Sequence, residues 1–282
     1  MRLTIRDIQK LNSSGEKLVM ITAYDASSAR LSEAAGAPLL LVGDSLGMVI
    51  QGHDSTIPVT LEHMIYHCEI VNRVTTRPLI VGDLPFMTYS ISPEQAMRSA
   101  ARLVQKSGVQ AVKIEGGESV ATAISRLTHA GIPVMAHLGL TPQSVNQFGG
   151  FRVQGREIDS ARRLIRDALL VQESGAFAVV LELVPAPLAA LISDLLDIPT
   201  IGIGAGAGCD GQVQVFHDLL ALAGDFLPRH AHRYTDAGTA IQTALAQYVA
   251  EVKAGAFPTD QQSFTMNDEL IAALRGEFQG RA

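Results

Sequence analysis

The sequence predicts an α/β fold in which eight parallel strands, each followed by a helix, close into a single (β/α)8 TIM barrel. Apolar runs and amphipathic stretches alternate about eight times along the 282 residues, too often for most doubly wound sheets. Five of the apolar runs also end in an acid, a base or a histidine: LVGD at 41–44, IVGD at 80–83, VKIE at 112–115, VMAH at 134–137 and VVLE at 179–182. In a parallel barrel those ends lie side by side and form the usual active-site face.

The individual elements follow from apolar periodicity and from capping residues. The predicted strands cover residues 18–23, 39–42, 78–83, 109–115, 132–137, 176–182, 199–203 and the first half of 213–222, an ambiguous stretch that ends near His217 and Asp218. The predicted helices cover residues 5–11, 27–35, 61–73, 93–107, 119–130, 157–174, 187–194 and 239–254. Thr4 with Asp7 has a capping pattern for an extra N-terminal helix outside the repeating unit, and Ser92 with Pro93 begins the helix at 93. We expect one domain over residues 1–282, with a tail from 258 that is mobile or forms an oligomer contact.

Composition excludes several classes of protein. Hydrophobic residues make up 47% of the chain, so a large core can form, and the net charge of -6 argues against a general nucleic-acid binder. Cys68 and Cys209 are too few for a disulfide framework or a cysteine-based metal site, so they are expected to be incidental buried thiols in a reducing compartment. No stretch has the pattern of a signal peptide or a membrane span. These features predict a cytoplasmic protein whose partners are small molecules.

Three carboxylates follow consecutive predicted strands: Asp44, Asp83 and Glu115. Each alone is easily explained as a helix cap or a solvated loop acid. Together, at equivalent positions, they would repel one another unless a cation lay between them, and oxygen ligands with room for water suit Mg²⁺.

Further polar residues share that predicted face. Lys113 lies two residues before Glu115, so on a strand both side chains point to the same face. Lys113 is expected to bind a substrate carboxylate or to stabilise an enolate oxygen. The alternatives are a Schiff base with the substrate or a salt bridge with a neighbouring acid. Glu182 lies between apolar neighbours, and the loss of water around it is expected to raise its pKa toward the range of a general base. The alternative is a buried acid with a structural role. His137 is expected to hydrogen-bond a substrate oxygen, or else to be a satisfied polar group.

Two loops are less specific. The glycine-rich stretch 202–208 is expected to bind phosphate, to form the floor of a cosubstrate pocket, or only to let loops pack closely. The polar loop 50–59 is typical of a lid or a binding segment. Taken together, the residues suggest metal-assisted enolisation of a 2-oxo acid, in which a nearby base removes the C3 proton.

At this point the sequence resembles the ketopantoate hydroxymethyltransferase (3-methyl-2-oxobutanoate hydroxymethyltransferase) family, over roughly residues 4–258. The motifs that carry the resemblance are TAYD at 22–25, VGDSLG at 42–47, DLPF at 83–86, VKIEGG at 112–117, HLGLTPQ at 137–143 and IGIGAG at 201–206. One departure is QSFT at 262–265, where many relatives carry a histidine-flanked Ser-Phe; it puts in doubt only that segment's local role in packing or assembly.

The resemblance implies a barrel of the phosphoenolpyruvate/pyruvate superfamily type, a requirement for Mg²⁺, and the first committed step of pantothenate synthesis. 5,10-Methylenetetrahydrofolate would donate the one-carbon unit to 3-methyl-2-oxobutanoate, giving 2-dehydropantoate. The resemblance also implies a homo-oligomer, typically a decamer of two pentamers.

The family's functional residues carry over onto matching positions. Asp44, Asp83 and Glu115 match the metal site, and the first two would contact the ion directly. Glu182 matches the proton acceptor. With His137 added from the strand-end argument, the substrate-binding set is Asp44, Ser45, Asp83, Lys113 and His137.

Two other functions remain open from the residues alone. One is a C–C lyase or phosphonomutase of the same superfamily, although such relatives usually have an active-site cysteine in a mobile loop. The other is a non-catalytic barrel that binds an oxo acid, which would have little need for Glu182.

Overall fold

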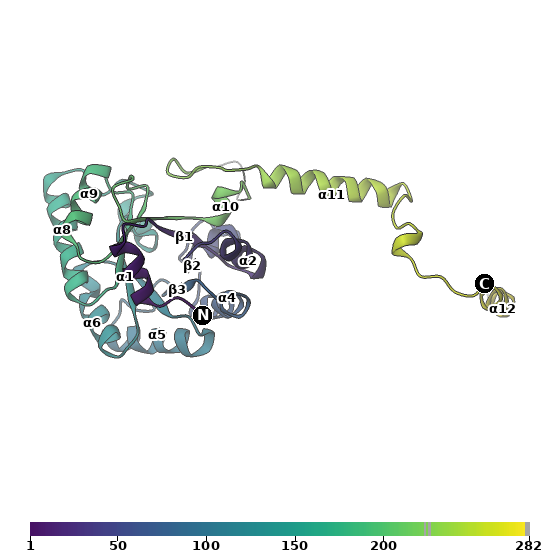
Figure 1. The fold of residues 1–282 in the computed structure, drawn as a ribbon, viewed down its shortest axis with the longest axis horizontal. Helices are drawn as coiled ribbons and strands as arrows, with labels where there is room; N and C mark the ends of the chain where they lie inside the picture. The colour runs from purple at the N-terminus through teal and green to yellow at the C-terminus, as the bar shows by residue number, and fades with distance from the viewer. Residues whose placement is uncertain (223, 225–226, 280–282) are drawn as a thin grey trace. The chain divides into compact units, whose positions relative to one another are not determined.

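Eight parallel strands form a closed barrel in the computed structural model, which describes residues 1–222, 224 and 227–279 (Figure 1). The strands are β1 (Leu18–Thr22), β2 (Leu39–Val42), β3 (Leu79–Asp83), β4 (Ala111–Glu115), β5 (Val134–Gly139), β6 (Ala178–Glu182), β7 (Thr200–Ile203) and β8 (Gly211–Gln214). They pair in chain order, and β8 closes the ring on β1, with Val213 opposite Met20. The predicted (β/α)8 barrel is confirmed.

Helices alternate with the strands, close to the predicted ranges. The α-helices are α1 (Ile5–Ser13), α2 (Ala26–Ala34), α3 (Leu46–Val49), α4 (Leu61–Val74), α5 (Pro93–Ser107), α6 (Ala121–His129), α7 (Val145–Phe148), α8 (Ile158–Glu173), α9 (Ala186–Leu195), α10 (Phe216–Leu219), α11 (Ala237–Lys253) and α12 (Asp268–Phe278). Short 3₁₀ turns are η1 (Glu118–Val120), η2 (Pro142–Ser144) and η3 (Asp260–Gln262). The predicted caps form: Thr4 and Asp7 make a capping box, and Ser92 caps α5. None of the helices in the described part of the chain combines the length and the apolar character that spanning a bilayer requires.

The hydrophobic core has two layers because successive strand residues face opposite sides. One set, including Leu40, Ile80 and Val112, packs outward against the helices. The other, including Met20 and Val81, fills the barrel interior, and Ile8 of α1 joins this inner cluster. The extra N-terminal helix therefore contributes to the barrel core. Cys68 and Cys209 are buried free thiols, as expected.

The last strand was predicted in the wrong place. It runs from Gly211 to Gln214, while His217 and Asp218 belong to the short helix α10. Gly211 pairs with Leu18 so closely that a Cβ at this position would clash with the Leu18 backbone. In the sequence this glycine looks like part of the preceding glycine-rich turn, which hid the start of the strand.

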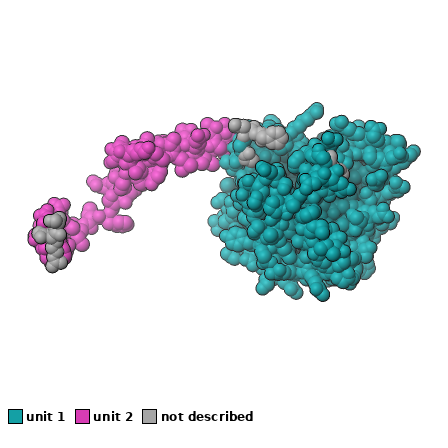
Figure 2. Space-filling model, turned by 180° about the vertical axis from the view of Figure 1, so that it is seen from behind, with its two compact units in different colours: residues 1–234 teal, residues 235–282 magenta. Residues whose placement is uncertain are grey.

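The chain divides into two compact units, residues 1–234 and residues 235–282 (Figure 2). The division falls at 234, ahead of the predicted tail from 258, and α12 follows the helix predicted at 239–254. Neither α11 nor α12 buries a residue. Within the described chain, these two helices therefore contribute no buried side chain to a core. That residues 1–282 act as one domain stays a prediction.

Glu33 of α2 carries a prediction for stability. Its Oε1 accepts hydrogen bonds from Thr76 N (2.9 Å), Thr76 Oγ1 (3.1 Å) and Arg77 N (2.7 Å), which ties α2 to the turn before β3. Burial opposes the charged form, but these hydrogen bonds outweigh it and hold the pKa of the Glu33 carboxyl below its usual value. Glu33→Gln should therefore cost about 1 kcal/mol of unfolding free energy at pH 7 in urea denaturation.

The sign of the pH dependence follows from that lowered pKa. The contribution of Glu33 is complete above the unfolded-state pKa of about 4.3 and is lost as the pH falls through the folded-state value. The difference between wild type and Glu33→Gln should therefore shrink in acid. Glu62→Gln is the control, since the partner of Glu62 within the described chain is the exposed Arg102. A difference that grows in acid would contradict this account.

Candidate active site

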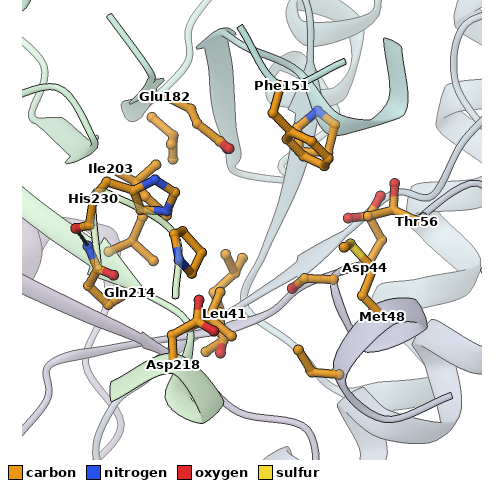
Figure 3. Close-up of a pocket in the computed structure, with 18 of the residues that line it drawn as sticks. Leu41, Asp44, Met48, Thr56, Phe151, Glu182, Ile203, Gln214, Asp218 and His230 are labelled. Carbon is orange, nitrogen blue, oxygen red and sulfur yellow. Dashed lines mark hydrogen bonds between the residues drawn. The ribbon is translucent and has the colours of Figure 1, made fainter. Parts of the chain in front are cut away.

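A cavity of about 860 Å³ opens at the carboxyl ends of the strands (Figure 3). Asp44 and Glu182 border it from different sides. Every predicted site residue lines it: Asp44, Ser45, Asp83, Lys113, Glu115, His137 and Glu182. Successive side chains of a strand point to opposite faces, which explains why these residues meet. Asp83, Lys113, Glu115, His137 and Glu182 continue the inward-facing series of β3 to β6 after the apolar residues of the barrel interior.

Lys113 is the central cation of this cluster. Its Nζ lies 3.2 Å from Asp83 Oδ1, 3.8 Å from Glu115 Oε1 and 3.3 Å from His137 Nδ1. Burial opposes its charge, but the surrounding carboxylates of Asp83, Glu115 and Asp44 raise the pKa of Lys113 above its usual value. The ammonium form of Lys113 is therefore favoured, which disfavours the Schiff-base role, since that chemistry needs a neutral amine.

His137 joins two glutamates. Nδ1 lies 3.4 Å from Glu115 Oε1, and Nε2 lies 3.2 Å from Glu182 Oε2. Burial and the nearby Lys113 lower the pKa of His137, but its contacts with Glu115 and Glu182 outweigh both and raise it to about 9. These two contacts favour the charged imidazole and place its Nε2 against Glu182. Its predicted contact with a substrate oxygen stays a prediction.

Asp44 and Ser45 follow β2 in a tight turn. Asp44 N donates to Asp83 Oδ2 at 3.1 Å, and Ser45 Oγ shares a 2.8 Å hydrogen bond with Tyr24 Oη. Gly43 allows this turn, because a Cβ there would lie 2.8 Å from Ser45 Oγ. Burial, and then the charges of Asp83 and Glu115, raise the pKa of the Asp44 carboxyl well above its usual value.

Comparison with known proteins now decides the family. The family model for ketopantoate hydroxymethyltransferase matches residues 2–260. The chain belongs to this family. The 3-methyl-2-oxobutanoate hydroxymethyltransferase of Chloroflexus aggregans is 59% identical, over 99% of both chains. That of Gluconacetobacter diazotrophicus is 55% identical, over 98% of this chain and 100% of its own.

Solved structures with the same fold are more distant in sequence. A phosphoenolpyruvate phosphomutase from Streptomyces platensis subsp. rosaceus has a TM-score of 0.61 at 16% identity, over 99% of this chain and 98% of its own. A 2,3-dimethylmalate lyase has a TM-score of 0.58 at 16% identity, over 99% and 97%. At this identity the likeness shows the barrel fold alone.

The donor set of this hydroxymethyltransferase-family chain fits a divalent cation. Asp44 and Asp83 are buried neighbours, and burial raises the pKa of both carboxyls. Toward the residues that the structure describes, Asp83 Oδ1 makes a charge contact with Lys113 and no hydrogen bond that satisfies it. Among the described residues no group of three His, Cys, Asp or Glu side chains is arranged to hold a metal ion. Mg²⁺ commonly takes only one or two protein carboxylates and completes its shell with water and substrate oxygens. The place of Glu115 in the metal site stays a prediction.

Two residues of the site were missed in the sequence. Gln143 and Tyr89 are both buried and are hydrogen-bonded to the acidic cluster. Gln143 ends a motif that carried the family resemblance, which was the available signal. Tyr89 lies between β3 and α5, and nothing in its local sequence marks it.

The far wall of the cavity was missed as well. Asp218 of α10 and His230 border it, and Gln214 Nε2 donates to the His230 carbonyl at 3.1 Å (Figure 3). Burial raises the pKa of the Asp218 carboxyl. The eighth strand was predicted to end near His217 and Asp218, whereas Asp218 belongs to α10.

The glycine-rich stretch serves close packing. A Cβ at Gly208 would lie 2.7 Å from Ala190 Cβ, and a Cβ at Gly206 would clash with Ala186, so both glycines let the turn after β7 approach α9. A phosphate-binding role has no support in this geometry beyond the glycines themselves.

Proposed function

We propose that the protein transfers a hydroxymethyl group to C3 of 3-methyl-2-oxobutanoate and forms 2-dehydropantoate, with 5,10-methylenetetrahydrofolate as the one-carbon donor. This is the first step of pantothenate synthesis. Relatives that bear the corresponding enzyme name match it at 55–59% identity over nearly their full length. The observation that carries the proposal is Glu182, held by His137 at the edge of a cavity that contains a buried cation and paired carboxylates.

The residues divide the chemistry among themselves. Glu182 accepts the C3 proton, and the electron pair of the broken C–H bond enters the enolate. Lys113 stabilises the negative charge that develops on the oxo acid. C3 then forms the new C–C bond to the one-carbon unit, and both bonds from that carbon to the folate nitrogens break. Water supplies the hydroxyl group, the proton taken from C3 and the remaining proton of water go to the two folate nitrogens, and tetrahydrofolate leaves. Asp44 and Asp83 would hold Mg²⁺, which when bound supplies Lewis-acid polarisation of the keto group.

The size of the cavity supports a second substrate. About 860 Å³ is at the upper end of the range for drug-sized ligands, ~300–1,000 Å³, and a small oxo acid needs far less. Apolar side chains line the remaining part, among them Met48, Phe151 and Leu222. A bulky heterocyclic donor suits this space.

The competing functions have less support. The phosphomutase and lyase structures each share only 16% identity with the chain, so they support the fold and not their own reactions. A non-catalytic binder does not explain why Glu182 lies at the cavity edge with its Oε2 3.2 Å from His137 Nε2.

The quaternary and cellular proposals rest on the resemblance. A homo-oligomer, in the decameric form, would cover the exposed apolar side chains of α11, such as Leu245 and Tyr248. Sedimentation tests it. A cytoplasmic location agrees with two free thiols.

Proton exchange tests the reaction directly. The C3 proton of 3-methyl-2-oxobutanoate is followed by NMR in D₂O with Mg²⁺, before and after methylenetetrahydrofolate is added. We expect exchange of the C3 proton, loss of that exchange with EDTA, and product once the folate is present. Neither exchange nor product in the complete mixture would overturn the proposed function.

A further inference from the structure

The carboxylates at the centre of the site share one pattern. Each has one oxygen held by a hydrogen bond from the protein scaffold. Asp83 Oδ2 accepts from Asp44 N at 3.1 Å, Asp44 Oδ2 from Gln143 Nε2 at 2.8 Å, and Glu115 Oε2 from Gln143 N at 3.0 Å. Among described residues, Asp83 Oδ1 and Glu115 Oε1 accept no such hydrogen bond. Both oxygens face the charged amine of Lys113.

Gln143 supplies two of these three hydrogen bonds, one from its side chain and one from its backbone. Its side-chain amide is buried and can point only one way. Nε2 donates to Asp44 Oδ2 and to the Leu84 carbonyl (3.0 Å), so the reverse orientation would place Oε1 against two acceptors. The amide thus bridges the residues that follow β2 and β3.

Tyr89 orients that amide. Its hydroxyl donates to Gln143 Oε1 at 2.7 Å and accepts from Glu115 N at 3.3 Å. The chain of hydrogen bonds runs from Glu115 N through Tyr89 to Gln143 and on to Asp44. Since all four residues are buried, water is a poor substitute for any of these contacts.

We propose that Gln143, oriented by Tyr89, is a positioning residue that sets the places of Asp44 and Glu115 and thereby the affinity of the site for a divalent cation. The inference rests on the metal site of the proposed function, but it concerns neither the one-carbon donor nor the product. Outer-shell partners of this kind typically account for about 10–100-fold in metal affinity.

The test measures metal binding without any substrate. Free Mn²⁺ is titrated by EPR against wild type, Gln143→Met, Tyr89→Phe and the control Gln110→Met. Methionine keeps the length of the side chain and removes its polar atoms. Gln110 is a matched control because its side chain also links two backbone groups, Ile80 N and the Gly108 carbonyl, at the opposite ends of the strands.

We expect Gln143→Met to bind Mn²⁺ about 10–100-fold more weakly than wild type. Tyr89→Phe should show a smaller loss, because the amide keeps its two acceptors. Gln110→Met should bind Mn²⁺ as wild type does, even if its melting temperature falls as far as that of Gln143→Met. If Gln143 served only the stability of the fold, Gln143→Met and Gln110→Met would instead lose Mn²⁺ affinity in proportion to their melting temperatures.

Equal Mn²⁺ affinity in wild type and a folded Gln143→Met protein would overturn the inference, as would a wild type that binds no Mn²⁺. Weaker binding that simply follows the melting temperature, with Gln110→Met equally impaired, would also overturn it. Failure of the proposed function looks different: Mn²⁺ binds and depends on Gln143, yet no hydroxymethylated product forms.

Discussion

A Glu182→Gln protein is expected to bind the oxo acid and Mg²⁺ about as well as wild type and to lose about 10²–10⁴-fold in kcat. The amide keeps the shape of the side chain and an oxygen beside His137 Nε2, but it cannot take up a proton. Exchange of the C3 proton in D₂O should fall by the same factor as kcat. KM for 3-methyl-2-oxobutanoate should change little, because the proposed role of Glu182 is in the transition state of proton transfer and not in binding the substrate.

Glu173→Gln is the matched control for this substitution. Glu173 is the exposed last residue of α8, outside the barrel mouth, so the same chemical change there should leave kcat and exchange unaltered. A Glu182→Gln protein that retained exchange within tenfold of wild type would show that another group accepts the proton. It would also remove the strongest argument against a non-catalytic binder.

Lys113→Met is expected to have the second large effect, on both stability and activity. Lys113 is 4% exposed, and its Nζ lies 3.2 Å from Asp83 Oδ1 and 3.8 Å from Glu115 Oε1. Removing one partner leaves buried carboxylates without compensation, so unfolding free energy in EDTA should fall by about 3–5 kcal/mol. Loss of the cation that stabilises the enolate should lower kcat/KM by about 10²–10³-fold.

A double variant separates the two effects. Lys113→Met combined with Glu115→Gln removes one of the uncompensated charges, so part of the lost stability should return in urea denaturation. Activity should stay low, because the catalytic cation is still missing. Recovery of activity in the double variant would contradict the assigned role, and a single variant as stable as wild type would show that the buried acids do not depend on Lys113.

Much of the fold and of the acidic cluster could be predicted from short stretches of sequence. Apolar periodicity marked the strands because buried parallel strands need continuous apolar runs. The two-residue period of a strand placed Lys113 and Glu115 on one face before any contact was known. Asp44, Asp83 and Glu182 were found for the same reason: each follows or ends such a run, and the carboxyl ends of parallel strands meet on one face. The caps at Thr4 and Ser92 could be predicted because a capping side chain hydrogen-bonds to the first turn of its own helix.

Other features depend on residues far apart in the chain. His137 lies between Glu115 and Glu182 only because β4, β5 and β6 are neighbours in the closed barrel, and these contacts favour its charged form. The start of β8 at Gly211 follows from its pairing with β1, which no local pattern reports.

By itself, then, the sequence determined the barrel, the order of its elements and the acids and base at its mouth, since periodicity and strand ends are properties of short stretches. Only the tertiary structure decided which groups hold those charges in place. Gln143 reaches Asp44 across 99 positions, and Tyr89 reaches Gln143 across 54. Such partners are selected by the register and closure of the whole barrel, and no window of sequence contains both ends of the bond.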